Sequence, residues 1–161
     1  MPGRSAIRLN SLYKAVLVCL FLMSLSAVPL WASNDWNYED TRSDARDFVA
    51  GGFVHVRLSV GDMHIKRGDT NKISLRYTVK SRREKNVKEA NVDFDVRGND
   101  ATIEFHALSG ANTQFDVELE VPQNTNLDVH DKVGDVTVED VDGDKDLSLG
   151  VGDIRVSNGR A

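Results

Sequence analysis

Residues 133–138 read VGDVTV and residues 151–156 read VGDIRV, so one six-residue pattern recurs after eighteen residues. Residues 60–65, VGDMHI, are a third copy with the same order of apolar, Gly, Asp, apolar, polar and apolar residues. Glycine permits a sharp corner or a positive φ, and aspartate can accept a hydrogen bond from a nearby backbone N–H in such a turn. We assign this structural turn role to six residues: Gly61, Asp62, Gly134, Asp135, Gly152 and Asp153.

Alternation of apolar and polar residues with a period of two dominates the chain from residue 48 onward. The alternating segments are residues 54–60, 73–79, 92–96, 103–105 and 115–121. Such alternation predicts β-strands with one buried and one exposed face, and it places Val60 on the buried face. Because the copies recur after about 20 residues, we expect an all-β, single-domain β-solenoid or rolled β-sheet of short strands. A two-sheet β-sandwich fits the strands between residues 48 and 121 equally well.

Two polar segments lack this alternation. Residues 33–47 are polar and aperiodic, so we expect a linker or a loosely held arm before a β-strand-repeat domain at residues 48–161. Residues 81–90, SRREKNVKEA, are the one segment of the domain that could host a short helix. Their density of Lys and Arg favours a solvated loop.

Residues 1–32 have the pattern of an export signal. Three basic residues precede an apolar run from Ala15 to Trp31. Ser24 and Pro29 interrupt the run before it reaches the ~20 apolar residues of a membrane span, so we expect a cleaved signal peptide. The mature chain would then lie in the periplasm, on the outer surface or outside the cell. It would lack cysteine, because Cys19 leaves with the signal peptide.

Cleavage would also make the chain more acidic. The formal net charge changes from −5 to −8 when the three basic residues of the leader are removed. An acidic chain argues against nucleic acid as a partner, and it argues against an anionic membrane. We therefore expect contact with a membrane only during export.

Several short motifs of the domain resemble one bacterial family. They are residues 48–52, 60–63, 121–129 (VPQNTNLDV), 133–136, 141–143 and 152–154. Through these motifs residues 48–161 resemble the exported β-strand-repeat domain of unknown function of the "putative adhesin" family, which is related to autotransporter adhesin head domains. The resemblance implies a β-solenoid or rolled β-sheet, an exported or surface location, and no catalytic residues.

Candidate metal ligands are few. Asp140, Asp142 and Asp144 alternate around a glycine and are weak candidates for a calcium site, because Ca²⁺ prefers several carboxylate oxygens. Their spacing does not fit the twelve-residue calcium loop, whose last position needs an acid where Val151 stands. We therefore expect a solvated turn here, and no metal or other cofactor.

Catalytic groups are not expected either. The mature chain lacks a cysteine nucleophile and a Gly-x-Ser-x-Gly motif, and the carboxylates of residues 116–120 share an exposed strand face. The histidines occupy outward strand positions without zinc-ligand spacing: His55, His64, His106 and His130. The sequence predicts a protein that is not an enzyme.

Charge is divided unevenly along the domain. Residues 53–90 carry a net charge of +6, and residues 111–161 carry −8. Cross-strand pairs of opposite charge would account for this division, and steering of a charged partner is the alternative. We expect a binding module that displays a charged strand face to an envelope or cell-surface protein or glycan. The residues expected on that face are His55, Arg57, Arg76, Thr78, Asp116 and Glu118.

The last strands form an apolar layer without a capping helix after Val156. We expect another copy of the chain, a partner, or the arm at residues 33–47 to cover this edge. A homo-oligomer formed through the edge would make the protein a structural or stress-related envelope accessory, which is the alternative function. A calcium-binding protein is a weaker third hypothesis.

Overall fold

The computed structural model describes residues 36–69, 71–108 and 112–158. The predicted signal peptide, residues 1–32, lies outside the described residues. Within them, the prediction of an all-β fold is confirmed, because strands make up almost all of the regular structure. The strands are β1 (Tyr38–Asp47), β2 (Phe53–Arg67), β3 (Lys72–Ser81), β4 (Asn91–Arg97), β5 (Asp100–His106), β6 (Thr113–Val121), β7 (Asn126–Val133), β8 (Val136–Glu139), β9 (Lys145–Val151) and β10 (Ile154–Ser157), and the helix is α2 (Glu84–Glu89).

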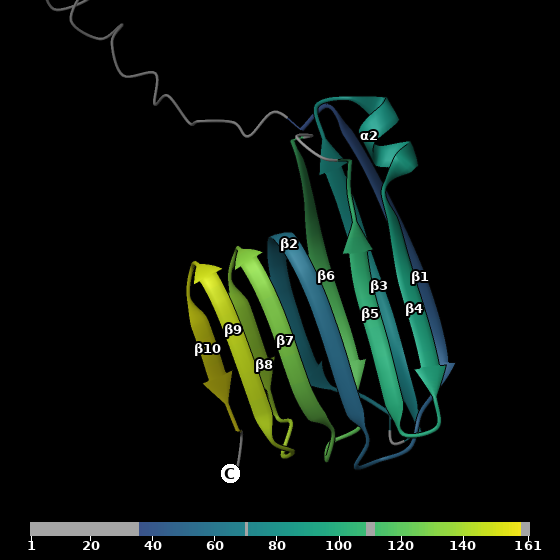
Figure 1. The fold of residues 1–161 in the computed structure, drawn as a ribbon, viewed down its shortest axis with the longest axis vertical. Helices are drawn as coiled ribbons and strands as arrows, with labels where there is room; N and C mark the ends of the chain where they lie inside the picture. Colours follow the sequence, from purple (N-terminus) through teal and green to yellow (C-terminus); the bar gives the residue numbers. More distant parts are fainter. Residues whose placement is uncertain (1–35, 70, 109–111, 159–161) are drawn as a thin grey trace, which may run out of the picture. The chain divides into compact units, whose positions relative to one another are not determined.

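The strands belong to one mixed sheet that bends along β2 and is not closed on itself (Figure 1). Residues 53–57 of β2 pair in parallel with β5 on one side, and residues 53–60 pair in parallel with β7 on the other. Residues 61–67 of the same strand pair in parallel with β6 and β8. The long strand β2 therefore belongs to two ladders of backbone hydrogen bonds.

We call these the first ladder, β4-β5-β2-β7-β9, and the second ladder, β1-β3-β6-β2-β8-β10. At one side β9 continues the first ladder in parallel with β7, and β10 continues the second in parallel with β8. At the other side β4, β3 and β1 are antiparallel to their neighbours. Consequently β2 lies between two strand pairs, β5/β6 and β7/β8, that both follow it in the chain.

The inward side chains of the two ladders share one hydrophobic core. Val56 of the first ladder and Ile65 of the second are fully buried. The Phe105 ring lies 5.8 Å from that of Tyr77 and 5.3 Å from that of Phe115, both edge-on. Since Phe105 belongs to the first ladder and its two partners to the second, these aromatic contacts pack the ladders against each other.

Residues 38–47 form the edge strand β1 rather than the loosely held polar arm that we expected. Every residue of β1 pairs with β3, from Tyr38 opposite Ser81 to Asp47 opposite Lys72. Arg42 adds hydrogen bonds to the backbone oxygens of Ala90 (2.7 Å) and Val87 (3.0 Å). The segment escapes prediction because backbone pairing, which needs no apolar alternation, holds it in place.

The segment at residues 81–90 contains the short helix α2, so the expectation of a solvated loop was wrong. The helix places Val87 and Asn86 in buried positions. The Asn86 side chain donates a hydrogen bond of 3.0 Å to the Ser81 hydroxyl. The buried side chain of Val87 and the hydrogen-bonded amide of Asn86 therefore hold the helix in place, and its other side chains are charged and exposed.

The inward and outward faces exchange at the glycine corner of β2. Leu58 and Met63, on either side of the corner, are both buried, whereas Val60 is 41 % exposed. Its equivalents in the later copies, Val133 and Val151, are 45 % and 67 % exposed. The prediction that Val60 is buried was wrong, because the corner interrupts the two-residue period.

Candidate functional site

The three Gly-Asp steps lie side by side at one edge of the molecule, because Val60 pairs with Val133 and Val133 with Val151. Gly134 and Gly152 have φ values of 150° and 136°. A Cβ on Gly134 would lie 1.7 Å from the carbonyl oxygen of Gly61, and one on Gly152 would lie 1.7 Å from that of Gly134. Each carbonyl therefore occupies the space that a side chain on the next glycine would need.

The aspartates of these steps form a hydrogen-bonded row. The backbone N–H of Asp135 donates to Oδ1 of Asp62 (3.0 Å), and the N–H of Asp153 donates to Oδ1 of Asp135 (2.9 Å). The bond from Asp153 is the main cause that lowers the pKa of the Asp135 carboxyl, and Arg155 contributes. Two of the three carboxylates therefore satisfy a backbone donor of the next corner, which is a structural role.

A buried acid lies beneath these corners. Asp131 of β7 is 4 % exposed, and it occupies an inward position between Leu58 of β2 and Leu149 of β9. Its Oδ1 accepts a 3.3 Å hydrogen bond from the N–H of Val133, and its Oδ2 has no hydrogen-bond partner among the described residues. Burial raises the pKa of this carboxyl to about 6. In the alignment of the repeated copies, Asp131 corresponds to Leu149. This correspondence is the feature of the sequence that could have predicted the inward position of Asp131.

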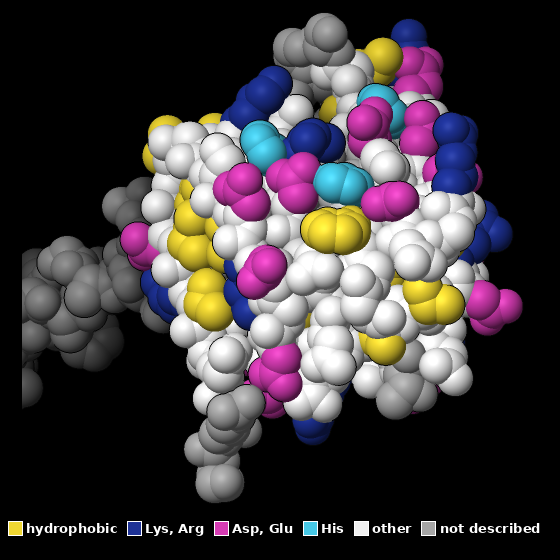
Figure 2. All heavy atoms as spheres, turned by 60° about the horizontal axis from the view of Figure 1, so that its bottom comes forward, with side chains coloured by type: hydrophobic (Ala, Val, Ile, Leu, Met, Phe, Trp, Pro, Cys, Tyr) yellow, Lys and Arg dark blue, Asp and Glu magenta, His cyan; other side chains and the backbone are white. Residues whose placement is uncertain are grey.

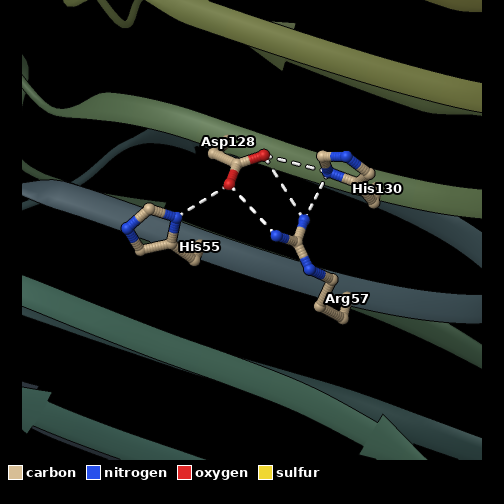
Figure 3. Close-up of polar contacts among 4 residues, drawn as sticks. All are labelled: His55, Arg57, Asp128 and His130. Carbon is tan, nitrogen blue, oxygen red and sulfur yellow. Dashed lines mark hydrogen bonds and ion pairs between the residues drawn. The ribbon is translucent and has the colours of Figure 1, made fainter.

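The outer face of the first ladder carries a polar cluster of His55, Arg57, Asp128 and His130 (Figure 3). Asp128 on β7 is its centre. Its carboxylate lies 2.8 Å from Nδ1 of His55 and 2.9 Å from Nδ1 of His130, and it accepts hydrogen bonds of 3.3 and 3.2 Å from Arg57. Arg57 also contacts His130 directly. Both rings turn Nε2 away from the carboxylate (Figure 3).

Electrostatics favours the ionised form of this central carboxylate. The pKa of Asp128 is lowered, chiefly by the hydrogen bond from His55, while partial burial opposes the shift and Arg57 adds to it. One anionic group thus fixes the orientation of three cationic or potentially cationic side chains, in the way that outer carboxylates orient histidine ligands.

A shallow cavity of about 590 Å³ lies beside the cluster on the same strands. Arg57, His106, His130 and Lys132 contribute basic groups to its wall, and Ser59 and Ser148 contribute hydroxyls. Figure 2 shows histidines gathered among acidic and basic side chains on one face of the molecule. The arrangement offers an open surface on which hydrogen-bond donors lie beside the apolar side chains of Leu58, Phe105 and Leu149.

The residues expected on one charged face are divided between the two ladders. His55 and Arg57 lie on the first ladder, whereas Arg76, Thr78, Asp116 and Glu118 line a second cavity of about 720 Å³ on the second. Acidic side chains outnumber basic ones in the second cavity, and His64 pairs there with Glu139 at 3.0 Å. The prediction that these six residues share one strand face was therefore wrong, because β2 bends between its two halves.

The weak calcium candidates lie in the connection between β8 and β9. Asp142 accepts a 2.7 Å hydrogen bond from Gln123, and the backbone N–H of Asp144 donates to Asn126 (3.0 Å). Asp140 has a positive φ of 58°. Within residues 36–69, 71–108 and 112–158, no three His, Cys, Asp or Glu side chains are arranged to hold a metal ion. In the same part of the chain, no helix has both the length and the apolar character that crossing a membrane requires.

Comparisons with known proteins give only distant similarity. No protein-family model and no curated protein matches the chain. A "putative cell adhesion protein" from Clostridium sporogenes is 11 % identical, covers 71 % of this chain and 59 % of its own length, and has a TM-score of 0.42. A "putative adhesin" from Parabacteroides merdae is 15 % identical, with coverage of 74 % and 56 % and a TM-score of 0.39. This chain thus spans less than two thirds of the length of either structure.

The polar cluster makes a measurable contribution to stability. Replacing Asp128 by alanine should lower the free energy of unfolding by about 1 kcal/mol at neutral pH, because three side chains lose a partly buried, charged acceptor. Since the pKa of Asp128 is lowered on folding, this stabilisation is present above its unfolded value of 3.8 and is lost as pH falls through the folded value. Urea unfolding of both proteins at neutral and strongly acidic pH measures the difference.

The matched control for this prediction is Asp146→Ala. Asp146 is the neighbour of Asp128 on β9 and shares its outward row, but its carboxylate makes none of the cluster contacts. We expect a change within about 0.5 kcal/mol at both pH values. Equal effects of the two substitutions would contradict a stabilising role for the cluster.

Proposed function

We propose that this chain is an exported, non-catalytic binding module of the adhesin type, which binds an envelope or cell-surface protein or glycan. The outer face of the first ladder is the proposed binding surface. The observation that carries the proposal is the cluster around Asp128, whose side chains hold one another in place beside an open cavity. Side chains that are already ordered lose less conformational freedom when a partner binds.

We also propose that β2, β7/β8 and β9/β10 are three turns of a short β-solenoid. The stacking of Gly61, Gly134 and Gly152 supports this, since each corner leaves room only for the backbone of its neighbour. In a solenoid each turn buries its apolar side chains against adjacent turns. The inward side chains of β2 and of β7/β8 follow that rule, and Leu147 and Leu149 of β9 are half-buried against them. The proposed location is the periplasm, the outer surface or the extracellular medium.

Capture of a partner by the mature chain, residues 33–161, tests the binding surface. We would crosslink the tagged chain to an envelope fraction and quantify the captured partner for two double variants. Arg57→Ala with His130→Ala removes two basic groups of the cluster, and recovery should fall at least ~10-fold if these groups are central to the interface. Arg76→Ala with His64→Ala removes one arginine and one histidine from the second ladder and should leave recovery unchanged.

Two outcomes would contradict this binding surface. Recovery that survives the loss of Arg57 and His130 would place the interface elsewhere. Equal losses in both double variants would indicate a general effect of surface charge. Thermal unfolding of each variant must remain cooperative for the comparison to hold, and we expect this because all four side chains lie on outer faces.

The alternative is an envelope accessory that acts through self-assembly. The exposed apolar side chains at the β9 and β10 edge favour it, with Ile154 and Val156 42 % and 51 % exposed. Light scattering over a range of concentrations separates the two functions. One homo-oligomer of fixed mass, formed without any other component, supports assembly, and a monomer at every concentration supports the binding module.

A further inference from the structure

The outer edges of β9 and β10 have no strand partner within the described residues. β9 pairs only with β7 there, and β10 pairs only with β8. Leu147 and Leu149 are half-buried, whereas Val151, Ile154 and Val156 are exposed. The edge lies on the left in Figure 1, and Figure 2, which keeps the same side on the left, shows hydrophobic side chains gathered there.

The repeated contacts of the Gly-Asp steps define what can pair with this edge. At the step from β8 to β10, the N–H of Gly134 donates to the oxygen of Val151 (3.0 Å), and the N–H of Val136 donates to the oxygen of Asp153 (2.9 Å). In return, Asp135 accepts from the N–H of Asp153. One turn earlier, Met63 donates to Asp135 and Asp62 accepts from Asp135 in the same pattern.

In the last turn, β9 and β10, the groups equivalent to these donors and acceptors point out of the edge. They are the N–H groups of Gly152 and Ile154, which are donors, and Oδ1 of Asp153, which is an acceptor. Arg155 contacts Oδ2 of Asp153 at 3.0 Å, which leaves Oδ1 in the position that Asp62 and Asp135 use for a backbone donor. At the earlier steps the two donors meet backbone oxygens and the aspartate oxygen meets a backbone N–H. A parallel strand pair that bends beside Gly152 would supply the same backbone groups.

The residue that stacks on Gly152 must be glycine. The Gly152 carbonyl takes the place that the Gly61 and Gly134 carbonyls take at the earlier steps, where an added Cβ would lie 1.7 Å from the oxygen. Apolar residues three positions before the glycine and one position after the aspartate of the Gly-Asp step would cover Leu149 and Ile154. A segment that alternates apolar and polar residues around a Gly-Asp step therefore satisfies both the hydrogen bonds and the apolar layer.

We propose that the β9 and β10 edge binds a parallel strand pair of another polypeptide that bends at an apolar-Gly-Asp-apolar step. The three such steps that the described residues contain, at Gly61, Gly134 and Gly152, already occupy their own places in the stack. The occupant that we propose is a segment of a different chain that carries this motif, and it binds by strand addition at the edge. This interaction surface is the outer edge of the sheet, whereas the proposed binding surface is the outer face of the first ladder.

A synthetic peptide with the sequence of residues 145–158, KDLSLGVGDIRVSN, is the direct probe. We expect saturable binding to the purified mature chain by fluorescence anisotropy. A peptide with Gly152→Val should bind at least ~10-fold more weakly, because the added side chain meets a backbone carbonyl. In the protein, Asp153→Ala should weaken the original peptide about fivefold through the lost acceptor, and Asp153→Asn, which retains Oδ1, should restore most of the affinity.

Several results would overturn the proposal. They are the absence of saturable binding, equal binding of the two peptides, and equal effects of the two Asp153 substitutions. A homodimer that occupies the edge and excludes the peptide, seen by sedimentation, would assign the edge to a second copy instead. Loss of peptide binding with intact partner capture through Arg57 and His130 would leave the first-ladder function standing.

Discussion

Replacing Gly134 by alanine should lower the free energy of unfolding by more than about 4 kcal/mol, a loss reserved for severe disruption of a fold. The added Cβ would lie 1.7 Å from the carbonyl oxygen of Gly61, and neither backbone can move without separating β8 from β2. The position is central, since β7 and β8 join β2 to β9 and β10. Urea unfolding followed by far-UV circular dichroism measures the loss.

Two other glycines separate the corner contact from the general effect of losing glycine. Gly51 has a φ of 85° but nothing within 4 Å of an added Cβ, so Gly51→Ala should cost only about 1 kcal/mol. In Gly152→Ala the added Cβ would clash with the carbonyl oxygen of Gly134. This clash lies at the outermost turn, where β9 and β10 can separate from β7 and β8. We expect early, local loss of those two strands, visible by hydrogen exchange. A Gly134 variant as stable as the Gly51 variant would refute the stacked corner.

The fold could be predicted where it depends on local sequence. Alternation at residues 73–79 and 115–121 corresponds to β3 and β6, and the three VGD copies all lie at corners. Spatial order could not be predicted in the same way. β2 lies between β5/β6 and β7/β8, and the pairing of Met63 with Val136 joins segments about 70 residues apart. Local pattern carries no information about which of several similar strands becomes the neighbour.

The candidate site could be predicted only in part for the same reason. The outward positions of His55 and Arg57 follow from alternation along β2. Asp128, which organises them, comes from β7, and only the register of β2 with β7 places it opposite His55. Arg76 has the same outward character, yet the bend in β2 puts it on the other ladder. The outward direction of these side chains could therefore be predicted from the sequence, whereas the identity of their cross-strand partners could not.

Replacing Asp131 by leucine should raise the free energy of unfolding by about 2–3 kcal/mol at neutral pH. The buried carboxylate therefore destabilises the native fold. The pKa of Asp131 rises from 3.8 to about 6 on folding, and an increase of about two corresponds to about 3 kcal/mol. Leucine would also continue the apolar row of Leu58 and Leu149. The charge of Asp62 increases the cost of ionisation, since it repels the Asp131 carboxylate.

The pH dependence has the opposite sign from that of a salt-bridged carboxylate. The folded chain binds the Asp131 proton more tightly than the unfolded chain, so the native protein should gain stability as pH falls through about 6 towards 3.8. Asp131→Asn keeps the size and the acceptor for Val133 but cannot ionise, so this gain should disappear. Asp146→Asn, an exposed substitution on β9, should leave it intact. Urea unfolding at neutral pH and near pH 5 decides the matter, because an Asn variant that still gains stability on acidification would assign the titration to another group.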